Sequence, residues 1–233
     1  MTVLHLADDT EAADLAAFLS RLLHYDRAAA VRLQAAGTAL AVFGRPASFE
    51  VLAVRAVRLA KPYEDGLDVT LDVTVSAGEL LESLDERAAT AGVPAAVTGP
   101  PWAGVLPPRG GWRPEPGLPP VDGLRALVAA AVTEFRTRTQ QLPPEERTRG
   151  ALDGIGREIW SRTVGQTRLP VRAVHAAQSL GFLRPASAGG GPDDLALFSS
   201  GAWLRLRAPY GSIAVRQAGQ GHPGLGALGL SVR

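Results

Sequence analysis

The 233-residue chain is long enough for one large domain or two small ones, and its apolar (46%) and charged (20%) fractions exclude a disordered or fibrous protein. It contains no cysteine, which excludes disulfides, thiolate nucleophiles and cysteine-ligated metal sites. The formal net charge of +1 is unevenly distributed, because residues 1–100 carry a net charge of −6 and residues 151–233 a net charge of +5.

The first residues do not read as a targeting signal. They lack a basic segment, and Asp8 and Asp9 interrupt the place where an apolar signal region would continue. No apolar run approaches the roughly 18 residues that a membrane span needs. We therefore expect a cytoplasmic protein without membrane association. Lys61 is the only lysine beside 23 arginines, a bias typical of high-GC genomes such as those of actinobacteria.

Residues 1–93 are predicted to form a small α+β domain. Apolar side chains at helical spacing indicate a helix over residues 10–24. Short strands follow between residues 30 and 76, and strict alternation over residues 68–76 favours an antiparallel sheet with one solvated face. Ser76 and Glu79 form a capping-box pattern, which predicts a short helix directly after the last strand.

Residues 94–120 differ in composition from both flanks. They hold nine of the eighteen prolines together with Trp102 and Trp112. Proline fixes φ and removes a backbone donor, so little regular structure is expected here. The two tryptophans favour an ordered strap over a domain surface, because a solvated tether gains nothing from so much apolar area. A linker is the alternative.

Residues 121–233 are predicted to form a helical domain closed by a C-terminal β-hairpin. Helices are expected from Asp122, from Pro143 and from Pro170, the last one ended by Gly181. Two strands should follow, at 195–208 and 212–217. The fold class is therefore α+β: an N-terminal helix plus a small antiparallel sheet, then a three-helix unit with a β-hairpin in a winged-helix-like layout.

A winged helix places its third helix in the major groove of DNA, and the residue types at the corresponding positions permit nucleic-acid contact. On the third helix these are Arg172, His175 and Gln178. On the outward side of the hairpin they are Trp203, Arg205, Arg207 and Arg216. The same residues could instead contact a protein partner. In a third interpretation, Trp203 covers a neighbouring helix and the arginines pair with the acidic N-terminal half.

Motifs of catalysis and cofactor binding are absent from the sequence. It has no HxxxH or GxSxG pattern, no Walker loop and no GxGxxG between a strand and a helix, so we assign no catalytic residue, metal ligand or cofactor. The favoured hypothesis is a non-catalytic binding or adaptor protein with an unknown protein partner or with self-association. A DNA-binding regulator is the alternative, and an unrecognised enzyme is the second alternative.

Two short segments carry a resemblance to other proteins. They are Leu106–Trp112 (LPPRGGW) and Ala202–Leu206 (AWLRL). Together they are similar to segments of an uncharacterised actinobacterial protein family of unknown function. The resemblance implies no activity, cofactor or partner.

Overall fold

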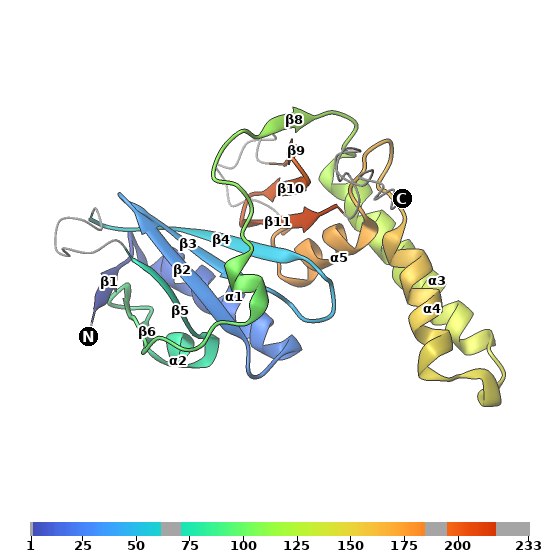
Figure 1. Ribbon diagram of the computed structural model, residues 1–233, viewed down its shortest axis with the longest axis horizontal. Helices are drawn as coiled ribbons and strands as arrows, with labels where there is room; N and C mark the ends of the chain where they lie inside the picture. Colours follow the sequence, from blue (N-terminus) through green and yellow to red (C-terminus); the bar gives the residue numbers. More distant parts are fainter. Residues whose placement is uncertain (1, 62–70, 185–194, 218–233) are drawn as a thin grey trace, which may run out of the picture.

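A computed structural model describes residues 2–61, 71–184 and 195–217. Its centre is an eight-stranded antiparallel sheet (Figure 1). In order across the sheet, the strands are β5 (Asp72–Ser76), β2 (Ala30–Ala36), β3 (Ala39–Gly44), β4 (Leu52–Arg58), β11 (Gly211–Arg216), β10 (Trp203–Ala208), β9 (Ala196–Ser200) and β8 (Arg113–Glu115). Helices and antiparallel strands together confirm the α+β class.

The N-terminal and C-terminal halves of the chain meet in the middle of this sheet. Strand β11 pairs with β4, with Ile213 opposite Ala53 and Ser212 opposite Val54. The other edge of β11 pairs with β10, which in turn pairs with β9. Both hairpin strands are therefore interior strands of a large sheet, and the free wing of a winged helix is not confirmed.

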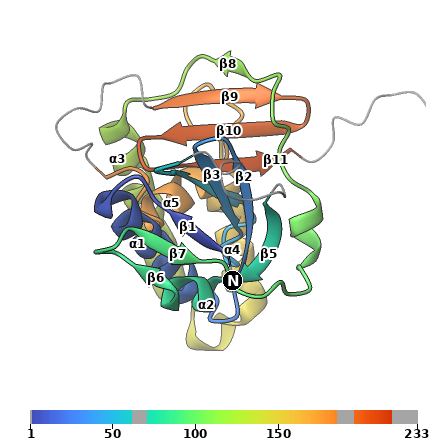
Figure 2. The same ribbon diagram turned by 90° about the vertical axis from the view of Figure 1, so that its left-hand side faces the viewer.

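Helices α1 (Asp9–Tyr25) and α5 (Val171–Ser179) pack against one face of the sheet, α1 on β4 and α5 on β11 and β10 (Figure 2). Helix α2 (Ala77–Glu82) packs against α1. The side chain of Asp8 caps α1 by accepting from the backbone N–H of Glu11 at 2.9 Å. Ser76 caps α2 by accepting from the N–H of Glu79 at 3.3 Å, which confirms the helix start predicted there. Gly181 ends α5 with a φ of +76°.

The inner face of the sheet and these helices enclose one continuous core to which both halves of the chain contribute. Fully buried members include Phe18, Leu33 and Val42 from the first half and Leu206 and Ile213 from the second. Alternation places Leu204 and Leu206 in this core, as the sequence predicts, and leaves Trp203, Arg205 and Arg207 on the outer face. No helix within the described ranges is long and apolar enough to cross a bilayer.

The proline-rich segment lies across the outer face of the sheet. It contains the short helix η2 (Pro101–Gly104) and strand β8. Trp102 and Leu106 pack on a second apolar cluster formed by Phe43, Leu52, Val54 and Ala214. The guanidinium of Arg32 donates to the carbonyl oxygen of Ala103. Before this segment, a small separate sheet joins β1 (Val3–His5), β7 (Thr90–Gly92) and β6 (Leu84–Asp85).

Helices α3 (Val121–Gln141) and α4 (Arg149–Ser161) form an arm that projects from the sheet (Figure 1). Two arginines and two glutamates join the helices, with Arg138 bound to Glu158 at 2.7 Å and Arg162 bound to Glu134 at 2.6 Å. Hydrogen bonds from Arg138 and then Arg162 lower the pKa of Glu158 to about 2. These ion pairs join the two helices at the surface, and Phe135 and Trp160 join them through an apolar contact.

Three predicted boundaries are corrected. The helix expected from Pro143 begins at Arg149, because residues 144–146 form only a 3-10 turn and the hydroxyl of Thr148 caps α4. The strand expected over 195–208 is two strands, because Gly201 turns the chain with a φ of +55°. Strand β5 begins at Asp72, and positions 68–70 of the predicted strand lie outside the described residues.

Gly154 lies inside α4, and a Cβ built there meets no atom within 4 Å. Alanine in a helix interior is favoured over glycine by about 0.8–1 kcal/mol, because glycine loses more backbone entropy on folding. Gly154→Ala should therefore raise the free energy of unfolding by up to about 1 kcal/mol, measured by urea denaturation. Unchanged or lower stability would contradict the open environment described at this position.

Candidate functional site

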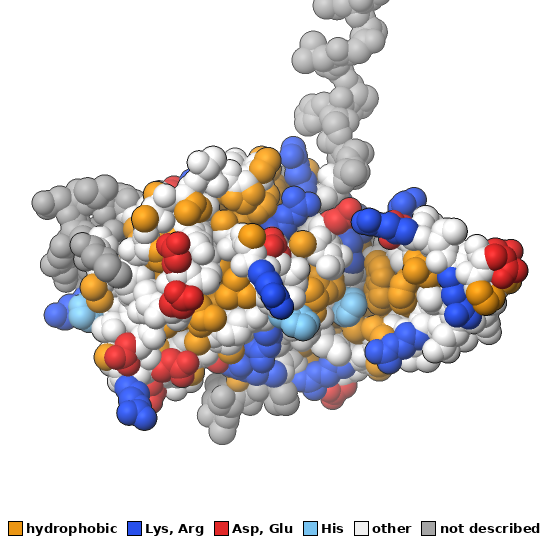
Figure 3. All heavy atoms as spheres, turned by 90° about the horizontal axis from the view of Figure 1, so that it is seen from below, with side chains coloured by type: hydrophobic (Ala, Val, Ile, Leu, Met, Phe, Trp, Pro, Cys, Tyr) orange, Lys and Arg blue, Asp and Glu red, His pale blue; other side chains and the backbone are white. Residues whose placement is uncertain are grey.

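A cleft of about 820 Å³ opens between helix α4 of the arm and the loop between β3 and β4. We call it the aromatic cleft. Its lining residues are Tyr25, Ala47, Ser48, Phe49, Glu50, Phe135, Arg149, Leu152, Asp153, Gly156, Arg157, Trp160, Ser161, Arg172 and His175. Both halves of the chain supply walls, so the cleft exists only in the joined fold. Figure 3 views the protein from below and shows hydrophobic side chains with arginines around them at the arm.

Helix α4 supplies one long wall of the aromatic cleft. Positions 149, 152, 153, 156, 157 and 160 all line it. Their spacing of three and four residues places them on one side of the helix. The fully buried Ile159 lies outside this stripe and belongs to the main core. The helix is therefore divided between a core face and a cleft face.

Five rings in contact form the apolar part of the aromatic cleft. Tyr25 meets Phe49 edge to face at 5.1 Å between ring centroids, and Phe49 meets His175 in the same way at 5.1 Å. The His175 ring stacks on Trp160 at 4.7 Å, and Trp160 lies 6.1 Å from Phe135. Such pairs add about 0.5–1.5 kcal/mol each beyond the area they bury. The wall is therefore ordered before any ligand arrives.

The arginines of the aromatic cleft are loosely paired. Arg149 lies 3.8 Å from Asp153, and Nε of Arg172 lies 4.0 Å from Glu50, near the limit of an ion pair. That Nε is buried and has no hydrogen-bond acceptor within the described part of the chain. Arg157 is exposed and has no ion-pair partner among the described residues. The cleft thus offers charge-assisted donors to an anion.

The loop that carries Glu50 is held in an uncommon backbone conformation. Glu50 has a φ of +52°, a region that non-glycine residues seldom occupy. Such a conformation costs of order 1–3 kcal/mol and persists only where the surrounding structure fixes it. Phe49, buried against Tyr25 and His175, provides that anchor. The strain therefore lies at the rim of the aromatic cleft.

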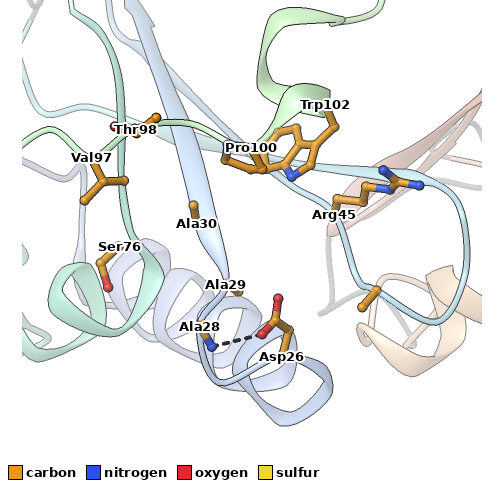
Figure 4. A pocket seen from close by; sticks show the side chains of 11 residues that line it. Asp26, Ala28, Ala29, Ala30, Arg45, Ser76, Val97, Thr98, Pro100 and Trp102 are labelled. Atoms are coloured by element: carbon orange, nitrogen blue, oxygen red, sulfur yellow. Dashed lines mark hydrogen bonds between the residues drawn. The ribbon is translucent and has the colours of Figure 1, made fainter.

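A second pocket of about 660 Å³ also involves this loop (Figure 4). We call it the Trp102 pocket, after the η2 side chain that stands over it. Arg45, Pro100 and Asp26 also line it, and the Asp26 carboxylate accepts from the N–H of Ala28 at 2.9 Å. Ala47 lines both pockets, so they meet at this loop.

The structure divides the seven residues singled out from the sequence between two sides of the sheet. Arg172 and His175 lie on α5 and line the aromatic cleft. Gln178, on the same helix, is exposed but does not line that cleft. The other four, Trp203, Arg205, Arg207 and Arg216, lie in β10 and β11 on the outer face, opposite α5. The two groups therefore do not share one face of the sheet.

The arginines of the outer face are engaged with neighbouring side chains. Arg205 donates to the hydroxyl of Ser212 at 2.9 Å and lies over the Trp112 ring at 5.8 Å. Burial, and then the charge of Arg207, lower the pKa of Arg205. Arg207 lies over the Phe198 ring at 5.1 Å. For Arg205, no ion pair with the acidic N-terminal half, the alternative interpretation of the sequence, is found among the described residues.

Sequence reasoning missed most of the aromatic cleft. No motif marks Phe49 or Trp160, and nothing in the sequence joins two rings so far apart along the chain. The mixed stripe of Arg149, Asp153 and Arg157 on the helix side away from Ile159 was the available signal. Among the described residues, no group of three metal-ligating side chains lies close enough to hold an ion.

Each half of the chain matches a family of unknown function. Residues 1–104 match the family described as domain of unknown function DUF8010, and residues 107–220 match the one described as DUF8185. The comparison with curated proteins found no match. The boundary between the two matched regions falls in the proline-rich segment, whereas the sheet and the core continue across it.

Burial lowers the pKa of the His175 imidazole below its usual 6.5, so this ring is neutral in the folded protein at pH 7. The unfolded chain takes up this proton near pH 6.5, before the native protein does. The free energy of unfolding should therefore fall as the pH drops below about 6.5, until the lower native pKa is passed. Glu50, Arg157 and Arg172 are the nearest charged side chains that line the cleft with His175.

His175→Phe keeps a ring on Trp160 and removes the proton. Urea denaturation at pH 7.5 and 5.5 should show a smaller loss of stability in this variant than in the unsubstituted protein. The other three histidines of the sequence are the same in both proteins, so the difference isolates His175. Equal losses in the two proteins would contradict the assignment.

Proposed function

We propose that the protein is a non-catalytic binding or adaptor protein and that a segment of a partner protein docks in the aromatic cleft. The observation that carries the proposal is the wall of five contacting rings, built from both halves of the chain and bordered by arginines. Preformed apolar clefts with a few polar groups at the rim are the usual shape of a binding site. Aromatic residues and arginine are also the types enriched where binding energy concentrates.

The contacts among the rings favour a protein segment over a nucleic acid as the ligand. Unpaired bases bind by stacking on open aromatic faces. Here one face of Trp160 is already covered by His175 at 4.7 Å, and Phe49 engages His175 from another direction. The rings therefore form an apolar wall against which an apolar side chain of a partner can pack. A DNA-binding role becomes one outcome of the tests below.

A displayed library of random peptides, selected on the purified protein, tests the proposal without knowledge of the partner. The selected peptides are then measured by fluorescence anisotropy against two pairs of matched variants. Gly156→Leu fills the aromatic cleft beside the rings, because a Cβ at this position already lies 3.5 Å from Phe135 and from Trp160. Gly154→Leu makes the same change on the same helix in open space.

Trp160→Ala and Trp203→Ala form the second pair, one in the aromatic cleft and one on the outer face. Binding should weaken at least about thirtyfold in Gly156→Leu and Trp160→Ala, the loss typical of a dominant contact, and should persist in both controls. Circular dichroism checks that each variant folds. The proposal fails if no selected peptide depends on the cleft variants, or if Trp203→Ala alone abolishes binding.

A further inference from the structure

Resting on the proposed function, we infer that the docked segment is acidic, carries a large apolar side chain, and crosses the β3–β4 loop to occupy both the aromatic cleft and the Trp102 pocket. The inference starts from the two pocket-lining arginines that have no ion-pair partner among the described residues. Arg157 lines the first pocket and Arg45 lines the second, and both are exposed. An unpaired arginine in each pocket favours a ligand with at least two carboxylates.

Across the two pockets, four arginines face three carboxylates. Asp153 and Glu50 are the acidic groups of the aromatic cleft, and each lies beside an arginine that also lines it. Asp26 is the acidic group of the Trp102 pocket, and its carboxylate accepts from the backbone of its own turn. Arg157 and Arg45 remain available to an incoming anion, and they border apolar surface that desolvates the contact.

The buried Nε of Arg172 adds a third donor. It has no hydrogen-bond acceptor in the described part of the chain and lies 4.0 Å from Glu50. The rest of the Arg172 side chain is 26% exposed, and a carboxylate of the partner would meet this exposed part, since the Nε itself is buried. This position lies in the aromatic cleft beside His175, next to the place where an apolar side chain would rest on the rings.

Because the two pockets are neighbours, one segment of a partner can be long enough to occupy both. Ala47 lines both, so the two pockets are neighbours at this loop, and its small side chain is the one that the segment would cross. Beyond it, Trp102 and Pro100 provide a second apolar surface beside Arg45 (Figure 4). A segment with one apolar anchor on the rings and acidic residues on either side therefore matches the chemistry of the whole groove.

The peptides selected above also test this inference, through their composition and through charge reversal. The peptides whose binding is weakened by Gly156→Leu should be enriched in Asp and Glu around one large apolar residue. Their affinity should fall as the salt concentration rises. Arg157→Glu and Arg45→Glu should each weaken binding about tenfold. Arg136→Glu reverses an exposed arginine of α3 outside both pockets and should leave affinity unchanged.

The outcomes separate this inference from the proposed function. Cleft-dependent peptides without acidic enrichment, or with affinity indifferent to salt, overturn the inference and leave the proposed function standing. Loss of affinity in Arg157→Glu with none in Arg45→Glu overturns the crossing into the Trp102 pocket. A fluorescein-labelled single-stranded DNA 12-mer that binds the unsubstituted protein but not Gly156→Leu would overturn both.

Discussion

Replacing Arg55 with methionine should lower the free energy of unfolding by about 3 kcal/mol, because it removes the buried cation at the junction of the two halves. Arg55 is 7% exposed and binds Glu11 at 3.0 Å and Asp14 at 3.2 Å, while its Nη1 donates to the carbonyl oxygen of Tyr210 at 2.8 Å. Breaking a buried ion pair from one side leaves a carboxylate poorly compensated, which costs about 3–5 kcal/mol. We expect the lower end, since Arg58 still binds Glu11 and Arg184 still binds Asp14.

Arg58→Met is the matched control for this prediction. Arg58 also binds Glu11, but its side chain is 70% exposed, so water replaces the lost interaction. Guanidinium denaturation at pH 7 should show a much larger loss for Arg55→Met than for Arg58→Met. Similar losses would mean that Arg55 does not hold α1, β4 and the β10–β11 turn together.

Gly211→Ala should lower the free energy of unfolding by about 1–3 kcal/mol, the usual cost of overpacking a filled core. A Cβ at Gly211 would lie 2.6–2.8 Å from three ring carbons of Phe182. That ring is 2% exposed and stacks on Phe18 of α1 at 5.7 Å, so it has little room to move. The clash would force apart the start of β11 and the segment after α5.

A double-mutant cycle identifies the cause of this loss. Phe182→Leu shortens the side chain that the new methyl group meets, so the loss caused by Gly211→Ala should be smaller in its presence. Gly110→Ala, at a position with no atom within 4 Å, is the control and should change stability little. Strictly additive losses in the cycle would contradict a clash between positions 211 and 182.

Local patterns predicted the elements of this fold but not their assembly. The apolar stripe of residues 10–24 and the alternation in the last strands gave α1 and the burial of Leu204 and Leu206. Each of those patterns lies within one element, where the helical or strand period determines which face is buried. Strand β8 was hidden by Pro114, a residue tolerated there because β8 is an edge strand.

The pairing of β4 with β11 and the ring wall of the aromatic cleft depend on contacts between distant parts of the chain. Ala53 and Ile213 are ordinary strand residues, and neither identifies its partner. Phe49 and Trp160 both contact His175, and these contacts exist only in the folded protein, where β4 and β11 are paired. The two matched families divide the chain at the proline-rich segment, so the junction that forms the cleft could not be read from either half.

Hydrogen exchange on the complex with the tightest selected peptide tests the proposed binding site most directly. Mass spectrometry would compare amide exchange in the free and bound protein, segment by segment. Docking in the aromatic cleft predicts slower exchange at the β3–β4 loop, residues 45–50, and along α4, with β10 unchanged. Slower exchange confined to β10 and β11, on the outer face, would contradict it.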